Sequence, residues 1–409
     1  MSDPVPQSRP AILALSRRGL ATARWIASGL PTAEVLGRAG RADDADATFT
    51  DTIATLRALF AAGRPIVGVC AAGILVRALG PVLGDKTAEP PVLAVGEDGA
   101  SVVPLLGGHR GANALARRIA ETLETLPAVT TASDLAFGIA LDEPPAGWTL
   151  ANPVLAKDVA AGLLAGERVR IDPELDWLQA LPQADDAPWH LRAGVEVPGD
   201  DPAELVYHPR ALTLGVGCER GCDAEELSQL VRDTLAEAGL AEAAVAAVVS
   251  IDVKMDEPAV HATAAALGAP ARFFDAATLE AEAPRLETPS EAVYREVGCH
   301  GVAEGAALAA AGADGQLRVA KRKSRRATCA VGQAPRPLDA AGIGRKRGTM
   351  TLVGLGPGDP LMGTAEAAHA VDAATDLVGY SLYLDLLGDR AGGKTRHDFQ
   401  LGEEEARAA

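Results

Sequence analysis

Apolar residues in the first part of the chain repeat with two different periods. Short apolar runs predict strands at residues 11–15, 65–70, 92–95 and 102–106. Apolar residues at helical spacing predict helices at residues 19–28, 50–60 and 112–123. A turn at residues 97–99 should make the last two strands neighbours. Strands that alternate with helices predict a parallel, doubly wound α/β sheet.

The pattern changes twice further along and predicts two α/β domains with parallel or mixed sheets, joined by a small middle segment. Residues 142–209 are rich in proline and acids and have weaker periodicity, whereas strands and helices resume at residues 212–217. Prolines and glycines at residues 333–348 are typical of a linker. The predicted parts are an N-terminal domain at 9–140, a middle segment at 141–210, a C-terminal domain at 211–332, the linker at 333–348 and a final α/β part at 349–409.

Composition limits the partners of the chain. Its 409 residues carry a formal net charge of −17, which excludes a general nucleic-acid or anionic-membrane binder, because both need a basic face. An anionic small substrate would need a local basic pocket. Five scattered cysteines, no apolar run of membrane-spanning length and a polar N-terminus without a signal peptide's apolar core predict a cytoplasmic protein with reduced thiols.

Two loops in the first region carry candidate chemistry. The loop at residues 107–111 lies between a predicted strand and a predicted helix, where open α/β sheets bind ligands. It holds Gly107, Gly108, His109 and Arg110. A histidine at a helix N-terminus tends to stay neutral and can act as a general base, and an arginine beside it can hold a carboxylate. A surface histidine in a glycine turn is the competing interpretation.

The second loop, at residues 70–73, leads into a helix whose next turn carries Arg77. Backbone N–H groups at such a loop, that of Gly73 among them, are candidate donors to an anion. A close-packed turn between strand and helix explains the same residues equally well.

In the second region, a loop at residues 215–221 contains Arg220 and again lies between a strand and a helix. Asp223 and Glu226 have the spacing of a capping box for that helix, and Ser290 begins a further predicted helix as its cap. The dense basic run at residues 321–326 is interpreted as a solvated face or linker, with a landing site for a polyanion as the alternative.

A polar cluster follows the next predicted strand. It consists of Asp252, Lys254, Asp256 and Glu257. Carboxylates and a lysine at a strand's carboxyl end are candidates for a base, an orienting group and an anion partner. Capping of the following helix by Asp256 or Glu257 is the alternative.

We predict no metal site. Cys218 and Cys222 are four residues apart, and Cys299 and His300 add two further soft ligands. The paired spacing that is usual at zinc sites is missing, so buried or incidental cysteines are the better interpretation.

The joint order of several motifs resembles the cobalamin-biosynthesis protein CbiG family. The similar segments are residues 71–77, 85–86, 105–118 and 130–134 in its N-terminal domain, 152–153 and 160–167 in its middle segment, and 215–221, 250–254, 256–258, 272–274, 289–292 and 302–304 in its C-terminal domain. The resemblance covers about residues 9–332. It implies a cobalt-precorrin-5A hydrolase, which opens a δ-lactone on a ring-contracted corrinoid and releases acetaldehyde, without a cofactor.

The final part resembles a second family. A predicted strand at residues 350–353, a glycine loop and a helix from about Thr364 look like the opening of the tetrapyrrole methyltransferases, and residues 378–383 resemble the precorrin-3B C(17)-methyltransferase branch. The resemblance implies a cofactor loop made of Gly354, Gly356, Pro357, Gly358 and Asp359. Such domains are much longer than this part, so we expect a truncated start that binds S-adenosylmethionine only if the domain is complete.

Lactone hydrolysis requires a base, oxyanion donors and cations for the substrate's carboxylates. We assign the base to His109, with one of Asp252, Asp256 and Glu257 as the alternative, and oxyanion donation to amides at residues 71–73 or 107–108. The acetate and propionate arms are assigned to Arg77, Arg110, Arg220 and Lys254. The corrinoid should lie between the two α/β domains, against a positive patch that excludes residues 321–326.

Two other function classes fit the sequence. The chain could be a corrinoid-binding or transfer protein, since its C-terminal region resembles a companion protein of the aerobic pathway. It could also be an S-adenosylmethionine-dependent precorrin methyltransferase if the gene continues past Ala409. Other enzymes of the cobalamin pathway are the expected protein partners.

Overall fold

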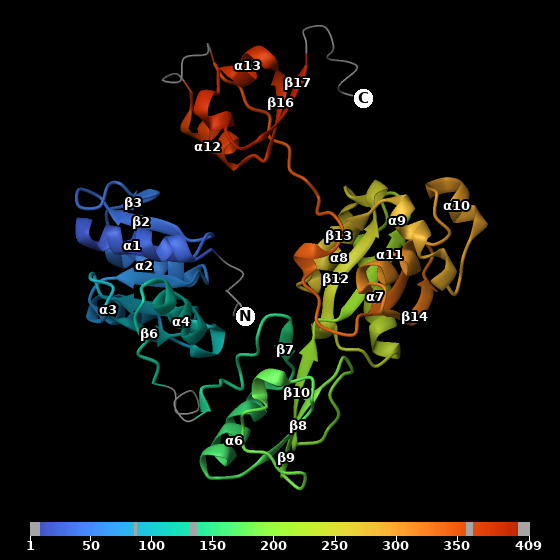
Figure 1. The fold of residues 1–409 in the computed structure, drawn as a ribbon, viewed down its shortest axis with the longest axis horizontal. Helices are drawn as coiled ribbons and strands as arrows, with labels where there is room; N and C mark the ends of the chain where they lie inside the picture. Colours follow the sequence, from blue (N-terminus) through green and yellow to red (C-terminus); the bar gives the residue numbers. More distant parts are fainter. Residues whose placement is uncertain (1–8, 86–87, 131–136, 357–362, 400–409) are drawn as a thin grey trace. The chain divides into compact units, whose positions relative to one another are not determined.

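The computed structural model describes residues 9–85, 88–130, 137–356 and 363–399, apart from the side chain of His109. The chain divides into two compact units, Met1–Lys346 and Arg347–Ala409 (Figure 1). Within the described residues, no helix combines the length and the apolar character needed to cross a bilayer.

The N-terminal sheet has the strand order β3-β2-β1-β4-β5-β6. Its strands are β1 (Ala11–Ala14), β2 (Glu34–Arg38), β3 (Ala47–Phe49), β4 (Ile66–Val69), β5 (Val92–Val95) and β6 (Val102–Leu106). Neighbouring strands from β3 to β5 are parallel, whereas β6 is antiparallel to β5. The predicted pairing of residues 92–95 with 102–106 is therefore confirmed, and the sheet is mixed.

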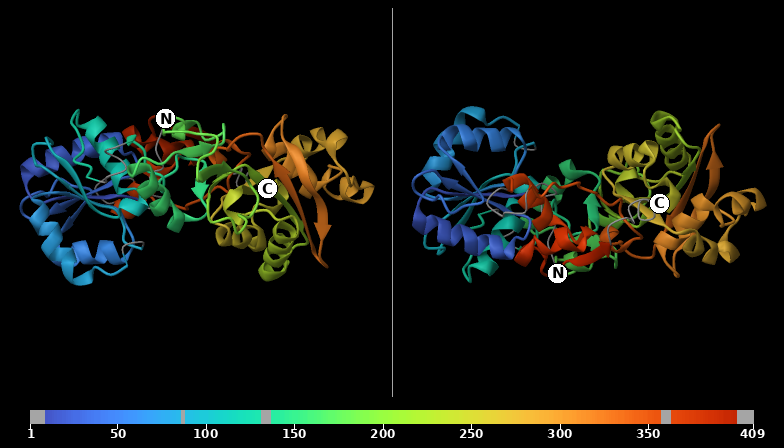
Figure 2. Two further views of the ribbon diagram at one scale, coloured as in Figure 1. Left: turned by 90° about the horizontal axis from the view of Figure 1, so that it is seen from below. Right: turned by 90° about the horizontal axis from the view of Figure 1, so that it is seen from above.

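Helices cover both faces of this sheet (Figure 2). On one face pack α1 (Arg17–Gly29) and α4 (Ala112–Thr122), and on the other α2 (Thr52–Ala61) and α3 (Ala72–Leu79). Every residue of β1, β4 and β5 is buried as a result. Burial on both faces explains why these strands are continuous apolar runs rather than alternating patterns.

The middle segment, which has weak periodicity in the sequence, contains a mixed sheet of its own. Its strand order is β7 (Trp148–Leu150), β10 (Glu204–Pro209), β9 (Trp189–Ala193) and β8 (Val169–Ile171), and α6 (Pro153–Leu164) packs against it. Trp177 contacts both Trp148 and Tyr207, and the Tyr207 hydroxyl donates to the carbonyl of Leu141. Aromatic packing and short strands replace the long apolar runs of the other sheets.

The C-terminal sheet has the strand order β13-β12-β11-β15-β14. Its strands are β11 (Leu212–Cys218), β12 (Val245–Ile251), β13 (Ala271–Phe274), β14 (Gln316–Lys323) and β15 (Ala327–Gln333). The first three are parallel, β15 is antiparallel to β11, and β14 is antiparallel to β15. The helices are α7 (Ala224–Glu237), α8 (Pro258–Ala266), α9 (Ala276–Ala281), α10 (Glu291–Val297) and α11 (Val302–Ala311).

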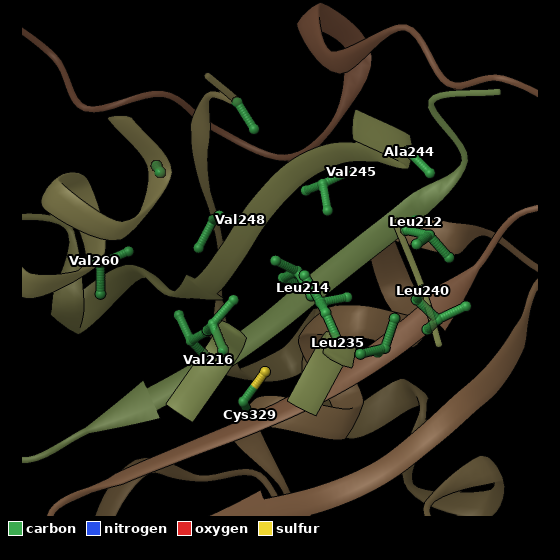
Figure 3. Close-up of a cluster of buried hydrophobic side chains, with 14 of the residues drawn as sticks. Leu212, Leu214, Val216, Leu235, Leu240, Ala244, Val245, Val248, Val260 and Cys329 are labelled. Carbon is green, nitrogen blue, oxygen red and sulfur yellow. The ribbon is translucent and has the colours of Figure 1, made fainter. Parts of the chain in front are cut away.

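Alternate residues of the central strands enter two cores. Leu214 and Val216 pack with Leu235 of α7 and Val260 of α8 on one face, as Figure 3 shows. On the opposite face, α9 and α11 cover residues such as Val249. This layered packing fixes the direction in which the loops at the end of the sheet project.

Gly215 and Gly217 belong to β11, so the expectation that the loop begins at residue 215 is wrong. A Cβ atom on Gly215 would lie 1.8 Å from the carbonyl oxygen of Ala303 on α11. The glycine therefore allows a helix backbone to approach the strand closely, and it does not mark a turn.

The smaller unit contains α12 (Ala365–Ala373), α13 (Ser381–Asp385) and a parallel pair of strands, β16 (Asp376–Tyr380) and β17 (Thr395–Phe399). The predicted helix start is confirmed, because the Thr364 side chain accepts a hydrogen bond from the Ala367 N–H. The predicted strand at residues 350–353 is wrong: in the described structure these residues pair with no strand, and Leu352 is 97% exposed.

Candidate functional site

A cavity of about 700 Å³ opens at the carboxyl ends of β11 and β12. Its walls come from the segments that follow these strands, from α10, from the start of α11 and from the turn between β14 and β15. The sheet order changes direction here, since β12 lies on one side of β11 and β15 on the other. Open α/β sheets bind ligands at such a switch point.

The cavity lining combines an apolar wall with a basic rim. Its apolar side chains include Ile251, Val253, Val293, Val297 and Val302. The basic side chains are Arg220, Lys254, Lys321, Lys323, Arg325 and Arg326, and the acidic ones are Glu219 and Glu296. A chain with net charge −17 thus has an excess of cations in this cavity. The lining suits a partly apolar ligand with anionic groups.

Lys254 is the cation of the lining that lies beside a buried carboxylate. Its side chain is 15% exposed, and its Nζ lies 3.9 Å from Oε2 of the buried Glu257. The Glu257 carboxylate accepts instead from the Gly221 N–H, at 3.1 and 3.3 Å. Glu257 therefore ties the loop after β11 to the start of α8, and its side chain makes no cap hydrogen bond to that helix.

The two other predicted carboxylates are placed differently. Asp256 accepts a hydrogen bond from Arg220, which also donates to the Val253 carbonyl at 2.8 Å. The Asp256 side chain is 65% exposed. Asp252 starts a short 3-10 turn after β12 and is half-buried, outside the lining of the cavity. The structure thus brings Arg220, Lys254, Asp256 and Glu257 together, with both carboxylates engaged by protein groups.

The basic run at residues 321–326 forms the end of β14 and the turn into β15, so its interpretation as a linker is wrong. Arg326 donates to the Glu219 carboxylate at 2.9 Å and to the carbonyls of Arg220 and Gly221. In the described part of the chain, neither Lys323 nor Arg325 forms a side-chain hydrogen bond or ion pair. The sequence interpretation missed both as rim cations, although the run itself was the available signal.

The sequence interpretation also missed the contacts of two further carboxylates with the basic run. Glu304 of α11 is 1% exposed and accepts from the backbone N–H of Lys321. Glu226 of α7 accepts from the Ser324 hydroxyl and from the Arg326 N–H. Asp223 caps α7 as predicted, but Glu226 does not complete a capping box, because its carboxylate faces the basic turn.

The thiols near the cavity are unsuited to nucleophilic chemistry. Burial raises the pKa of Cys218 to about 11 and also raises the pKa of Cys222. Both thiols are therefore protonated near neutral pH. Among the described residues, no group of three or more His, Cys, Asp or Glu side chains has the arrangement needed to hold a metal ion.

The candidate loops of the N-terminal domain lie at opposite edges of their sheet. Val69, which precedes the loop at 70–73, pairs with Val95 at the carboxyl end of β5. Leu106, which precedes Gly107, pairs with Val92 at the amino end of β5. The loop at 107–111 follows an antiparallel strand, so it does not lie at the edge where the parallel strands end.

Local packing explains several of these N-terminal residues. Gly107 has a φ of 76°, and a Cβ there would lie 2.6 Å from the Pro90 carbonyl oxygen, so both conformation and space require glycine. Gly108 and Arg110 are exposed, and Arg110 donates to the Ala88 carbonyl at 3.4 Å. Arg77 is exposed and donates to the Gly73 carbonyl within its own helix. His109 lies in a 3-10 turn before α4.

The glycine loop of the smaller unit lies partly outside the described residues, which include Gly354 and Gly356 but not Pro357, Gly358 or Asp359. A cavity of about 150 Å³ is lined by Gly354 and by residues of α12. Sites for drug-sized ligands have volumes of about 300–1,000 Å³. The cavity is smaller than this range.

Comparisons with known proteins identify the family. Residues 212–332 match the model of the cobalamin synthesis G C-terminus, and residues 54–134 match that of the cobalamin synthesis G N-terminal domain. A cobalt-precorrin-5A hydrolase from Salmonella typhimurium is 31% identical over 304 residues, which cover 66% of this chain and 82% of that protein.

Two shorter similarities accompany this one. Protein CobE from a Sinorhizobium species is 48% identical over 133 residues, 32% of this chain and 86% of that protein. The cobalamin biosynthesis protein CobIJ from Mycobacterium tuberculosis is 45% identical over 69 residues, 16% of this chain and 13% of that protein. With the matched family models and the similarity across most of the Salmonella protein, the chain belongs to the cobalt-precorrin-5A hydrolase (CbiG) family and is an enzyme of hydrolase type.

Proposed function

We propose that this chain hydrolyses the δ-lactone of cobalt-precorrin-5A and that the cavity of the C-terminal domain binds the corrinoid. The observation that carries this assignment is the lining, which joins apolar side chains such as Val253 and Val297 to a rim of lysines and arginines. A corrinoid has an apolar macrocycle and several carboxylate arms, so it needs both kinds of surface. A substrate of this type also accounts for a basic cavity in an acidic protein.

The cations of the rim have different tasks in this proposal. Lys254, which is mostly buried, offers its ammonium group to a carboxylate or to the oxyanion of the tetrahedral intermediate. Lys323 and Arg325, whose side chains form no hydrogen bond or ion pair within the described residues, bind peripheral carboxylates. Arg220 and Arg326 are already paired with Asp256 and Glu219, so they contribute mainly by shaping the rim.

The reaction begins when a base removes a proton from water as the water oxygen attacks the lactone carbonyl. The acyl C–O bond of the lactone then breaks and leaves a carboxylate and an alkoxide on the extruded carbon. As this alkoxide forms a C=O bond, the C–C bond that joins the extruded carbon to the macrocycle breaks, the electron pair stays on the macrocycle and takes up the proton that the base had removed, and acetaldehyde leaves. We retain His109 as the base, since Asp256 and Glu257 are held by Arg220 and by the Gly221 N–H, and Asp252 lies outside the cavity lining. The N-terminal domain then supplies the base, and the C-terminal domain holds the substrate.

Acetaldehyde release provides the direct test. The purified chain is incubated with cobalt-precorrin-5A, and acetaldehyde is followed by NADH oxidation with added alcohol dehydrogenase. Lys254→Met is expected to lower the turnover or weaken binding by about tenfold to a hundredfold, as is usual for loss of a charged hydrogen-bond donor. Release at the background rate by the unmodified chain, with corrinoid bound, would contradict the proposal.

Corrinoid binding without catalysis is the second candidate. It is favoured by the similarity to CobE and by the engagement of Asp256 with Arg220 and of Glu257 with the Gly221 N–H, which occupies both carboxylates that could serve as a base. In that case visible absorbance would report tight binding of cobalt-precorrin-5A while no acetaldehyde formed.

The smaller unit corresponds, in our proposal, to the start of a precorrin-3B C(17)-methyltransferase. The glycine loop at residues 350–360 and the similarity to CobIJ support this assignment. Because its described cavity is too small for S-adenosylmethionine, we assign no methyl transfer to it. Sequencing the gene beyond the codon for Ala409 tests whether a complete methyltransferase follows.

A further inference from the structure

The turn between β14 and β15, on the rim of the cavity, carries a dense run of cations. Lys321, Arg322, Lys323, Arg325 and Arg326 fall within six consecutive residues. Cations at this spacing repel one another and favour an open, mobile turn. Something must therefore fix the turn if its cations are to bind a ligand in one geometry.

Glu304 fixes one side of the turn. Its buried carboxylate accepts from the Lys321 N–H at 2.9 Å. It also accepts from the backbone N–H groups of Glu287 and Thr288 and from the Thr288 hydroxyl, at 2.8–3.0 Å. The Thr288 carbonyl in turn accepts from the Lys321 ammonium at 2.9 Å. Glu304 thereby joins β14 to the segment that leads into α10, the opposite wall of the cavity.

Glu226 fixes the tip of the turn from the other face of the sheet. Its Oε1 accepts from the Ser324 hydroxyl at 2.6 Å and from the Arg326 N–H at 2.8 Å. The Ser324 hydroxyl also accepts from the Ala327 N–H, which closes the turn. The two carboxylates approach from α7 and α11, on opposite faces, and both hold backbone N–H groups rather than the charged ends of the rim side chains.

We propose that Glu226 and Glu304 are positioning residues that hold the basic turn in its binding geometry before an anionic ligand arrives. This inference rests on the proposed function, because it assumes that Lys323 and Arg325 bind the substrate's carboxylates. A preorganised rim loses little conformational entropy on binding, which strengthens binding without any contact between these two carboxylates and the ligand. Both carboxylates therefore act on affinity and not on the chemical step.

The test uses the full chain, with cobalt-precorrin-5A titrated by visible absorbance and acetaldehyde release measured in parallel. Glu226→Gln and Glu304→Gln are each expected to raise Kd and KM about tenfold, because the rim must then be ordered on binding, with kcat unchanged. Glu225→Gln, on the same helix as Glu226 but facing Arg232, is the matched control that should leave both constants unchanged.

A double-mutant cycle separates positioning from a general structural role. In a Lys323→Gln/Arg325→Gln background, each glutamate substitution should change Kd by less than twofold, because the side chains it positions are gone. If a glutamate substitution raises Kd by the same factor in this background as in the unmodified chain, the inference is wrong. If Glu304→Gln fails to fold, as judged by near-UV circular dichroism, Glu226→Gln at the half-exposed position carries the test.

The same cycle distinguishes a failure of this inference from a failure of the proposed function. If Lys323→Gln/Arg325→Gln weakens binding but the glutamate variants do not, the inference is wrong and the proposed cavity stands. If Lys323→Gln/Arg325→Gln leaves Kd unchanged, the proposed cavity is wrong and the inference falls with it.

Discussion

Cys218, the last residue of β11, lies opposite Ala327, the first residue of β15, in an antiparallel pair. This pairing puts the turn that precedes β15 at the edge where β11 and β12 end. A parallel β15 would have put the same cations at the far edge of the sheet. One strand direction thus unites the basic run with Lys254 and Arg220 at a single cavity.

The first prediction compares two sets of cations. Lys323→Gln/Arg325→Gln should weaken binding of cobalt-precorrin-5A about tenfold to a hundredfold and reduce its salt dependence, since charged hydrogen bonds contribute about 1.5–3 kcal/mol. Arg77→Gln/Arg110→Gln is the matched double substitution and tests the patch expected from the sequence. Calorimetry at two salt concentrations would measure both. A larger loss of affinity in Arg77→Gln/Arg110→Gln would favour the positive patch that the sequence predicts.

The second prediction concerns the base. His109→Asn should lower kcat by roughly two to four orders of magnitude and leave Kd largely intact, as is typical for loss of a general base. His369→Asn, at an exposed position of α12, is the control. Near-normal acetaldehyde release by His109→Asn, together with its loss in Asp252→Asn or Glu257→Gln, would move the base to the C-terminal domain.

The third prediction concerns the wall formed by α10, no residue of which is fully buried. His300 donates its backbone N–H to Glu280, its ring contacts Glu280 and Glu291, and it stacks on Tyr294. The hydrogen bond to Glu280 raises the pKa of His300. A raised pKa means that the stabilisation is complete below the unfolded pKa of about 6.5 and is lost as pH rises through the folded pKa.

The α10 amides should therefore be better protected against hydrogen exchange at pH 6 than at pH 8.5, once the pH dependence of intrinsic exchange has been corrected for. In His300→Gln this pH-dependent protection should disappear, whereas exchange in α7 should be unaffected. Equal protection of α10 in the unmodified chain and in His300→Gln at every pH would show that other contacts hold this wall.

The fourth prediction concerns acid stability. Burial opposes ionisation of Glu304, but the hydrogen bonds from Lys321, Thr288 and Glu287 outweigh it and lower its pKa. A lowered pKa stabilises the fold above the unfolded value of about 4.3, and the stabilisation is lost as pH falls through the folded pKa. Glu304→Gln should reduce the free energy of unfolding by about 1–3 kcal/mol at pH 7. Urea titrations should show this difference shrinking at acid pH; a constant difference would contradict the argument.

The fifth prediction concerns the smaller unit. The full chain should show no binding of S-adenosylmethionine by calorimetry, because the described cavity of about 150 Å³ cannot enclose it. The α12 segment should also be cleaved by protease before the rest of the chain, since Val371 is its one fully buried residue in the described structure. Micromolar binding of the cofactor would contradict this view.

Local sequence determined many individual elements of this protein. Uninterrupted apolar runs specified β4 and β5 as doubly covered strands, because only burial on both faces tolerates them. Ser290, Asp223 and Thr364 started helices where their side chains can accept an N–H bond. The order of short motifs along the chain also indicated the family.

Tertiary structure alone decided which of these elements form the cavity. A strand has the same two-residue period whichever way it runs, so its own sequence does not show its direction. The turn at residues 97–99 made β5 and β6 neighbours, but nothing local showed that β15 is antiparallel to β11. The direction of β6 removed Gly107 from the edge where β4 and β5 end, and the direction of β15 brought Arg325 to the edge where β11 ends. Glu226 and Glu304 found their backbone partners about 100 and 17 residues away, through helices packed on opposite faces of the sheet. Strand direction and such contacts depend on packing across the whole domain, which no local pattern encodes.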